Sequence, residues 1–290
     1  MQQVVSGLAS GGVYSSLALA LVLIHRATGV INFAQGEMAT FSTYIAWSLT
    51  ANHGWPYWPA FAVTLLVSFA GGVAIHQTII RPVEGGDLLR VVIVTIGLLL
   101  ALNGLMTWIW SGEVRAVESP FPSDTMQIAG VTVSLQDIGT IVVSLGAVGA
   151  LWLLFQFTKI GLAMRAAATN PAEARLVGVR VTWMLAFGWG LAAVLGAVAG
   201  LLAAPSVFLD PSMMQAVLIY AFAAAVLGGI DSPFGAVAGG LILGVGLNLL
   251  GTYVDFVGSD LRLPAALLVI LVVLLVRPQG LFGKPVVKKV

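Results

Sequence analysis

The sequence predicts an all-α integral membrane protein, a polytopic bundle of eight or nine transmembrane helices, and three observations support this fold class. Of the 290 residues, 59% are hydrophobic and only 9% are charged, and the mean hydropathy is +1.02. This composition leaves too little polar surface to cover a water-soluble globule. The apolar runs approach the length of about twenty residues that a helix needs to cross a bilayer. They also lack the two-residue alternation of an outer-membrane barrel.

Nine helices are expected within one membrane domain that comprises residues 1–290. Their approximate ranges are 4–24, 36–49, 58–80, 89–110, 138–157, 181–204, 213–229, 234–250 and 263–276. The first run is expected to remain in the protein, because it has neither the basic start nor the small-residue cleavage pattern of a signal peptide. The chain contains no cysteine, which excludes disulfides, thiolate metal sites and cysteine nucleophiles.

The connection between the first two expected helices is unusually polar. It contains Asn32, Gln35 and Glu37 within six residues, and a carboxylate at helix depth costs on the order of 3 kcal/mol. One interpretation is a helix start near the inner surface, with Asn32 and Gln35 as a capping pair and Glu37 complementing the helix dipole. The other is a broken helix that lines a transport route. Tyr14 and Asn103 are further candidates for such a route, although most polar side chains inside spans form interhelical hydrogen bonds.

The longest segment expected on the outer side of the membrane comprises residues 111–137. Within it, apolar and polar residues alternate from Gln127 to Val133 about a glycine turn, which predicts a small two-stranded ribbon. Such a ribbon either plugs the mouth of the bundle or offers a docking surface to an outside partner.

Residues 158–180 form a polar, basic insert between two long apolar runs, and a short helix is expected at 171–177. Asn170 is a suitable N-cap, Pro171 suits the first helical position, and Glu173 occupies the capping-box position. Gly178 can end the helix in the left-handed conformation. With Arg175 and Leu176 projecting from it, this helix is expected to contact another protein.

The basic residues predict the topology of the bundle. With residues 158–180 in the cytoplasm, alternation of the helices places eleven of the thirteen basic residues inside and two outside. This is the bias that the positive-inside rule requires, so the amino terminus is expected outside and the carboxyl terminus inside. The inner set is Arg26, Arg81, Arg90, Lys159, Arg165, Arg175, Arg180, Arg277, Lys284, Lys288 and Lys289, and the outer set is Arg115 and Arg262.

Enzyme motifs are missing from the sequence. It has no Walker-type phosphate loop, no His-Glu-x-x-His pair and no Gly-x-Ser-x-Gly elbow, and its three histidines are far apart. The chain is therefore expected to be no enzyme and to hold no metal or cofactor. A nucleic-acid partner is not expected either.

Four blocks of the sequence resemble the permease subunits of high-affinity branched-chain amino acid ABC importers, the H-type permease in particular. The first and last blocks are the most specific, and the four follow the family's order along nearly the whole chain. One departure is Gln35, where histidine is expected in most relatives. The blocks are residues 11–37, residues 161–166 with Asn170, Ala174, Leu176, Gly178 and Val179, residues 221–240, and residues 277–283.

The resemblance implies an importer of five parts in the inner, or cytoplasmic, membrane of a bacterium or archaeon. These are this permease, a second permease that forms a heterodimer with it, two ATPase subunits that hold ATP and Mg²⁺, and an extracytoplasmic substrate-binding protein. The substrates implied are branched-chain or hydrophobic amino acids, or related small carboxylic or amide compounds.

The same resemblance makes residues 158–180 the cytoplasmic coupling region of the importer. The helix at 171–177 is then hypothesised to dock in an ATPase groove. In this hypothesis Arg165, Glu173 and Arg175 orient the helix, and Ala172, Ala174 and Leu176 fill the groove. Closure of the ATPase pair would then tilt the bundle.

An ion-coupled secondary transporter of small amphipathic solutes is the main alternative. Such a protein is also a polytopic helical bundle, but it usually carries charged residues deep in several spans. Glu37 is the only acidic residue placed inside an expected span here, and the one basic residue, Arg90, lies at the very start of its span; the lack of deep charges favours the ABC permease.

Overall fold

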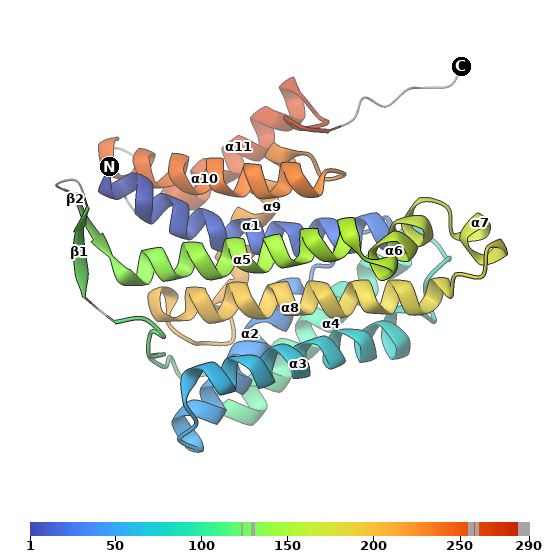
Figure 1. Cartoon of the computed structure of the whole chain (residues 1–290), viewed down its shortest axis with the longest axis horizontal. Helices are drawn as coiled ribbons and strands as arrows, with labels where there is room; N and C mark the ends of the chain where they lie inside the picture. The colour runs from blue at the N-terminus through green and yellow to red at the C-terminus, as the bar shows by residue number, and fades with distance from the viewer. Residues whose placement is uncertain (123, 129–130, 255–257, 259–260, 284–290) are drawn as a thin grey trace.

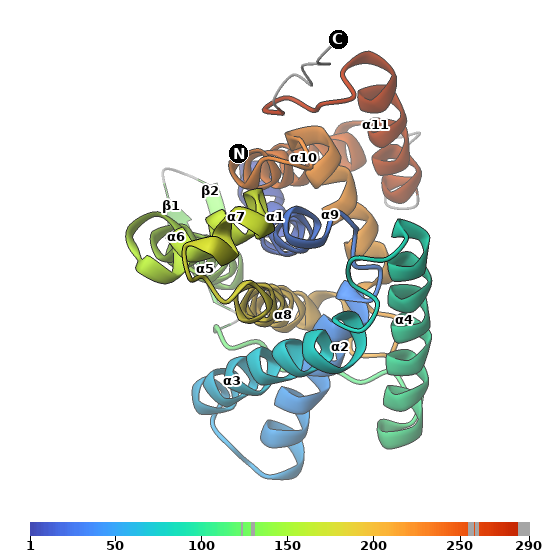
Figure 2. The same cartoon turned by 90° about the vertical axis from the view of Figure 1, so that its right-hand side faces the viewer.

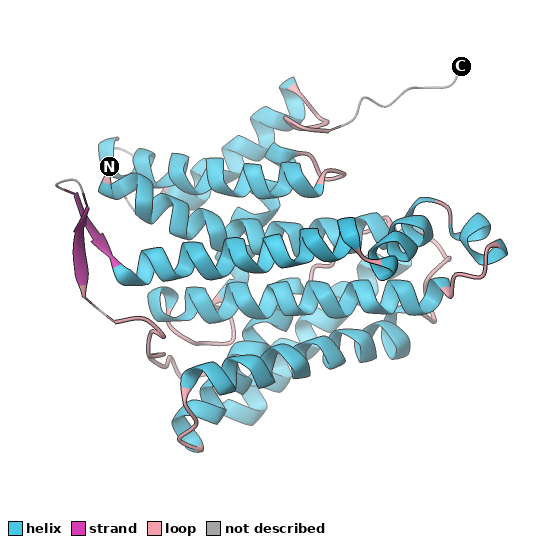
Figure 3. Cartoon of the chain, in the orientation of Figure 1, coloured by secondary structure: helices cyan, strands magenta, loops and turns pink. Residues whose placement is uncertain are grey.

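The computed structural model describes residues 1–122, 124–128, 131–254, 258 and 261–283, and this part of the chain forms a helical bundle with one small ribbon at its end (Figures 1 and 3). Within it, six helices are long and apolar enough to cross a membrane. They are α1 (Gln2–Thr28), α3 (Tyr57–Ile75) with its π-helical extension η2 (His76–Ile80), α4 (Leu88–Trp110), α5 (Leu135–Phe157), α8 (Val181–Val207) and α10 (Pro233–Tyr253).

The remaining helices are shorter than a full crossing. Two of them, α9 (Met214–Gly228) and α11 (Arg262–Val276), have 15 residues each and so extend about 22 Å, against about 30 Å of hydrocarbon. Helix α2 (Gln35–Trp47) continues into the π-helix η1 (Ser48–Asn52), and α6 (Lys159–Thr169) and α7 (Pro171–Leu176) lie at one end of the bundle (Figure 1). The helical membrane fold is thus confirmed, and the count of eight or nine spans stays a prediction.

Helices α1 and α8 form the centre of the bundle. Their most apolar stretches are 78% and 83% buried, whereas those of α4 and α5 are 17% buried. Seen end-on, α1 and α8 lie in the middle, with α5 and α6 on one side and α4 and α11 on the other (Figure 2).

Glycine allows α1 and α10 to approach closely. A Cβ atom at Gly244 would lie 2.5 Å from the carbonyl oxygen of Gly7, and one at Gly240 would lie 2.6 Å from the backbone nitrogen of Ser15. The Ser15 hydroxyl also donates to the carbonyl oxygen of Val237 at 2.8 Å. These contacts form a small-residue packing seam, which is how membrane helices associate without a hydrophobic driving force.

The predicted ribbon is confirmed. Strands β1 (Thr125–Ile128) and β2 (Val131–Ser134) pair antiparallel, with Thr125 opposite Ser134, and residues 129–130 at the turn lie outside the described residues. Val133 is buried, and β2 contacts α1 and α5. This packing favours the interpretation that the ribbon covers the end of the bundle. The interpretation that it is a docking surface stays a prediction.

The order of the helices groups most of the described basic residues at the end where α6 and α7 lie (Figure 1). Arg26 is near the end of α1, Arg81 follows η2, and Arg180 precedes α8. Arg115 and Arg262 belong to the opposite end, since Arg115 pairs with Leu209 after α8 and Arg262 approaches Gly251 near the end of α10. Lys284, Lys288 and Lys289 lie outside the described residues. The direction of the bundle across the bilayer stays a prediction.

Candidate functional site

Helix α7 begins and ends at local signals that the sequence contains. The Asn170 side-chain oxygen accepts a hydrogen bond from the Glu173 backbone nitrogen at 3.3 Å, and Pro171 occupies the first turn. Gly178 has a φ of 83°. Its N–H donates to the Arg175 carbonyl at 3.1 Å, and the Val179 N–H donates to the Ala174 carbonyl at 3.0 Å. These two bonds are those of a Schellman motif, so the expected cap and terminator are confirmed, with the helix ending at Leu176.

The capping box expected at Glu173 is not formed. A capping-box carboxylate accepts from the backbone N–H of the N-cap residue, but the Asn170 N–H donates to the Ala166 carbonyl at 3.1 Å and closes α6. Glu173 is exposed, as are its neighbours Ala172 and Arg175. The carboxylate is therefore available to a partner.

One predicted coupling residue points inward, which corrects the hypothesis that it fills an ATPase groove. Ala174 is only 3% exposed and belongs to a small cluster with Ala167, Val181 and Leu185. This cluster holds α7 against α6 and α8, so Ala174 fixes the position of the helix.

The apolar side chains that α7 offers to a partner are Leu176 and Val177, which are 87% and 78% exposed. The two residues are adjacent in the sequence, and contiguous exposed apolar side chains indicate an interaction site. The docking helix predicted at 171–177 included Val177 but gave it no role of its own, although an apolar residue directly before a helix-ending glycine was the available signal. Arg165 lies half-buried on α6, close to the same corner.

Loss of the cap is expected to loosen α7 without unfolding the bundle. Asn170→Ala removes the acceptor for the Glu173 N–H, and N-cap losses of this kind cost about 1 kcal/mol. Hydrogen exchange at residues 173–177 should accelerate about fivefold, and Asn170→Asp, which retains an acceptor oxygen, should keep the native rate. Equal acceleration in both variants would contradict the capping role.

A second candidate site lies where the chain turns back from α1 into α2. Gly29, with a φ of 73°, ends α1, and residues 30–34 lead to the first turn of α2. Asn32 and Gln35 are both fully buried. The Asn32 side-chain oxygen accepts from the Ala34 N–H at 3.0 Å, and its amide nitrogen donates to the Gln35 Oε1 at 3.2 Å. Ala34 is the N-cap residue, so the interpretation of Asn32 and Gln35 as a capping pair is wrong.

Gln35 fixes the depth of this turn. Its Nε2 donates to the carbonyl oxygen of Ala192 at 2.9 Å, and Ala192 lies about 17 Å along α8 from the start of that helix. The polar turn is thus near the middle of the bundle, which corrects the expectation that it lies near the inner surface. Gly196 makes room for the amide, because a Cβ there would lie 2.7 Å from the Gln35 Nε2.

Glu37 adds a buried carboxylate to the same turn. It is 2% exposed, and its Oε2 has no hydrogen-bond partner within the described residues. The adjacent Gly36 packs against Met214 and Leu218 of α9. A buried intramembrane carboxylate with one oxygen left unpaired is costly and marks a candidate functional position.

The other two candidate route residues contact distant segments of the chain: Tyr14 contacts α9, and Asn103 contacts the turn between α8 and α9. The Tyr14 ring lies 5.1 Å from that of Tyr220 on α9, and Tyr14 also lines a cavity of about 100 Å³. The Asn103 amide donates to the carbonyl oxygen of Pro211 at 3.0 Å. Within the described residues neither is hydrogen-bonded to the Asn32–Gln35 pair.

The protein is of the class of multi-pass helical membrane proteins. Its apolar spans, its buried polar turn and the capped helix beyond the spans define this class. The chain belongs to the family described as the branched-chain amino acid transport system permease component, whose model matches residues 3–277. The resemblance seen in the sequence is therefore confirmed. A family of transport permease components also agrees with the missing enzyme motifs.

Individual relatives align along the full chain. BraD, a high-affinity branched-chain amino acid transport system permease protein of Pseudomonas aeruginosa, is 32% identical over 100% of this chain and 98% of its own length. LivH of Escherichia coli, named in the same way, is 29% identical over 100% and 97%. The solved structure of PsaBC from Streptococcus pneumoniae in complex with Fab aligns with a TM-score of 0.52 over 94% of this chain and 91% of that chain. Its 14% sequence identity makes this a likeness of fold alone.

Proposed function

We propose that this chain is the transmembrane permease subunit of an ATP-driven ABC importer. The observation that carries the proposal is the match of residues 3–277 to a family of permease components, in a chain whose sequence contains no phosphate-binding loop. ATP and Mg²⁺ then belong to two partner ATPase subunits, and this chain needs no cofactor of its own.

The substrates that we assign are branched-chain or other hydrophobic amino acids, or related small carboxylic or amide compounds. The names of BraD and LivH support the first of these classes. A second permease, paired with this one as a heterodimer, and an extracytoplasmic substrate-binding protein complete the importer.

The orientation that we propose places the amino terminus outside and the carboxyl terminus in the cytoplasm of a bacterial or archaeal inner membrane. The distribution of basic residues supports it through the positive-inside rule. Residues 158–180 are then the cytoplasmic coupling region, and residues 111–137 form the extracytoplasmic segment.

Coupling takes place at α7 in this proposal. Leu176 and Val177 enter a groove of an ATPase subunit, while Arg165, Glu173 and Arg175 orient the helix against it. Asn170, Pro171 and Gly178 fix the ends of α7, and Ala174 holds it against α6 and α8. The helix therefore transmits closure of the ATPase pair to the bundle.

The substrate route is proposed to pass the polar turn at the start of α2. Asn32, Gln35 and Glu37 provide buried polar groups at the middle of the bundle, where a broken helix can hold a substrate or form a gate. Tyr14 and Asn103 are assigned to the same route.

Energy dependence tests this function against the secondary transporter. The complete importer, with both permeases, the ATPase pair and the binding protein, is reconstituted in vesicles, and uptake of radiolabelled leucine is measured. Uptake is expected to require ATP on the α7 side and to survive ionophores that collapse ion gradients. Gradient-driven uptake without ATP would overturn the proposal, whereas ATP-driven uptake of a different amphipathic solute would change only the substrate.

A further inference from the structure

An apolar groove follows α5 at the end of the bundle where α6 and α7 lie. Its volume is about 580 Å³, and it is lined by side chains of α1, α5, α6, α8 and α10. Leu145, Val148, Trp152 and Phe155 provide one wall from α5, and Phe234 and Val237 provide part of the other from α10. The groove therefore lies on the side of the bundle formed by α5 and α6, away from α4 and α11 (Figure 2).

The length of the groove matches half a membrane. Its α5 wall extends from Leu145 to Phe155, which is about 15 Å at the rise of an α-helix, and one leaflet of a bilayer has about 15 Å of hydrocarbon. Trp152 and Phe157, with ring centroids 5.6 Å apart, are exposed at the same end of α5. Aromatic side chains of this kind mark the boundary between hydrocarbon and headgroups.

Helix α6 lies across the end of the groove as an interfacial helix would. Thr158 caps it by accepting from the Gly161 N–H at 3.0 Å, directly after α5 ends. Met164 and Ala167 are buried on its inner face, whereas Ile160 and Leu162 are 45% and 61% exposed. An amphipathic helix with exposed aliphatic side chains beside spanning helices is typical of the membrane surface.

Two arginines line the groove at the end where α6 lies. Arg26, from the end of α1, and Arg165, from α6, both line it. Neither forms a salt bridge with a carboxylate in the part of the chain that the structure describes, and the Arg165 Nε is buried there without a hydrogen-bond partner.

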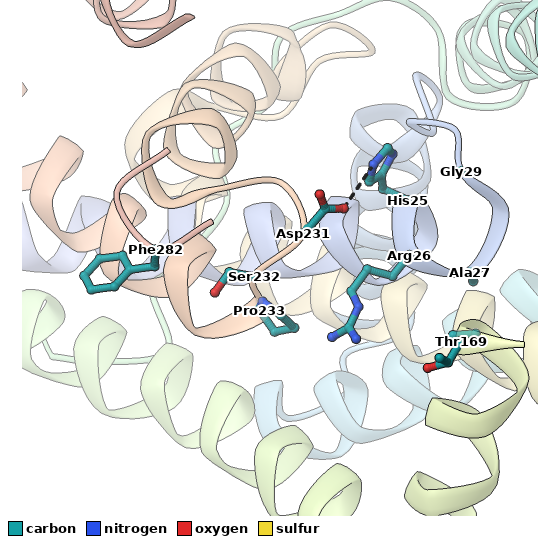
Figure 4. Close-up of a pocket in the computed structure, with 10 residues that line it drawn as sticks. His25, Arg26, Ala27, Gly29, Thr169, Asp231, Ser232, Pro233 and Phe282 are labelled. Carbon is teal, nitrogen blue, oxygen red and sulfur yellow. Dashed lines mark ion pairs between the residues drawn. The ribbon is translucent and has the colours of Figure 1, made fainter. Parts of the chain in front are cut away.

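One acidic side chain, that of Asp231, lines the cavity next to this end of the groove. Asp231 lies 3.7 Å from the His25 Nε2 and points toward it, whereas the Arg26 side chain extends the other way, between Pro233 and Thr169 (Figure 4). This adjoining polar cavity, which His25, Arg26, Thr169 and Ser232 also help to line, has a volume of about 660 Å³. There is thus space for a headgroup beside the Arg26 guanidinium.

We infer that the groove binds an anionic phospholipid of the leaflet on the α7 side. One acyl chain lies along α5 between Val148 and Val237, and the phosphate accepts hydrogen bonds from Arg26 and Arg165. Basic residues that border an apolar groove at this depth fit a negatively charged lipid headgroup. The site does not depend on the substrate and requires only that the chain spans a membrane. Arg165 is shared with the proposed coupling region, so lipid binding is measured on this chain without the ATPase subunits.

Quenching of Trp152 by brominated lipid tests the inference. The full-length protein is reconstituted with brominated phosphatidylglycerol or with brominated phosphatidylcholine of the same chains. The Trp152 signal is taken as the difference from Trp152→Phe. Phosphatidylglycerol is expected to bind more tightly than phosphatidylcholine by about fivefold for each arginine, since a basic residue at the surface contributes about 1 kcal/mol.

Charge variants locate the headgroup. Arg26→Gln with Arg165→Gln should abolish the preference for phosphatidylglycerol. The matched control, Arg81→Gln with Arg90→Gln, removes two exposed charges at the same end of the bundle and should retain it. An equal affinity for both lipids in the native protein, or an equal loss of preference in both double variants, would overturn the inference.

A second pair of variants tests the acyl-chain position without touching an arginine. Gly149 lines the groove, and a Cβ there would meet nothing within 4 Å, so Gly149→Leu should fill the groove without a clash. Gly146 on the same helix has equal space but does not line the groove. Quenching of Trp152 should fall in Gly149→Leu and persist in Gly146→Leu, and identical quenching in the two variants would overturn the inference.

Discussion

Gly244→Val is expected to destabilise the bundle by about 3 kcal/mol, the upper part of the range for overpacking. The added Cβ would lie 2.5 Å from the Gly7 carbonyl oxygen and closer still to the backbone of Gly11. Backbone atoms cannot rotate away, so α1 and α10 must separate. The contacts on either side of this point would then weaken, including the hydrogen bond from the Asn248 amide to the Gln3 carbonyl at 2.6 Å. Thermal unfolding of the purified protein in detergent provides the measurement.

Gly246→Val is the matched control for this substitution. It lies two residues further along α10, and a Cβ there would meet nothing within 4 Å. The same change of residue is expected to be neutral or to stabilise the helix by about 0.3 kcal/mol, because valine has a somewhat higher helix propensity than glycine. Similar melting temperatures for both variants would contradict the close approach of α1 and α10.

Features that depend on local pattern could be predicted from the sequence. Hydropathy located each apolar helix, because one hydrophobic run corresponds to one helix in a bilayer. Asn170, Pro171 and Gly178 determined α7, because capping depends on neighbouring residues alone. The alternation about a glycine similarly predicted the ribbon of β1 and β2.

The depth of a residue in the bundle and the face of a helix on which it lies could not be predicted, because both depend on partners distant in the sequence. Gln35 lies at the middle of the bundle because its amide reaches Ala192 and because Gly196 leaves room for it, and no local signal connects positions so far apart. Ala174 was assigned to the wrong face of α7 because a helix of 6 residues is too short for its periodicity to separate an inner from an outer side.

The second large effect is expected at the exposed tip of α7. Leu176→Asp should lower ATP-driven uptake and substrate-stimulated ATP hydrolysis by about thirtyfold, the effect of losing a contact worth about 2 kcal/mol at the centre of an interface. A carboxylate in an apolar groove loses its hydration without gaining a partner. Leu176 is 87% exposed, so folding and membrane insertion should be unchanged. Uptake, ATP hydrolysis and retention of the ATPase during purification of the complex are the three measurements.

Two further variants separate docking from folding. Val114→Asp introduces the same charge at another exposed aliphatic residue, 68% exposed, at the opposite end of the bundle, and should leave ATPase retention intact. Ala174→Asp instead places a carboxylate in the cluster with Ala167, Val181 and Leu185, so it should destabilise the α6–α7 corner and accelerate hydrogen exchange there. Native uptake in Leu176→Asp would show that α7 does not bind an ATPase through this side chain. Lost uptake with native exchange in α7 would establish that the exposed tip, and not the corner that supports it, carries the contact.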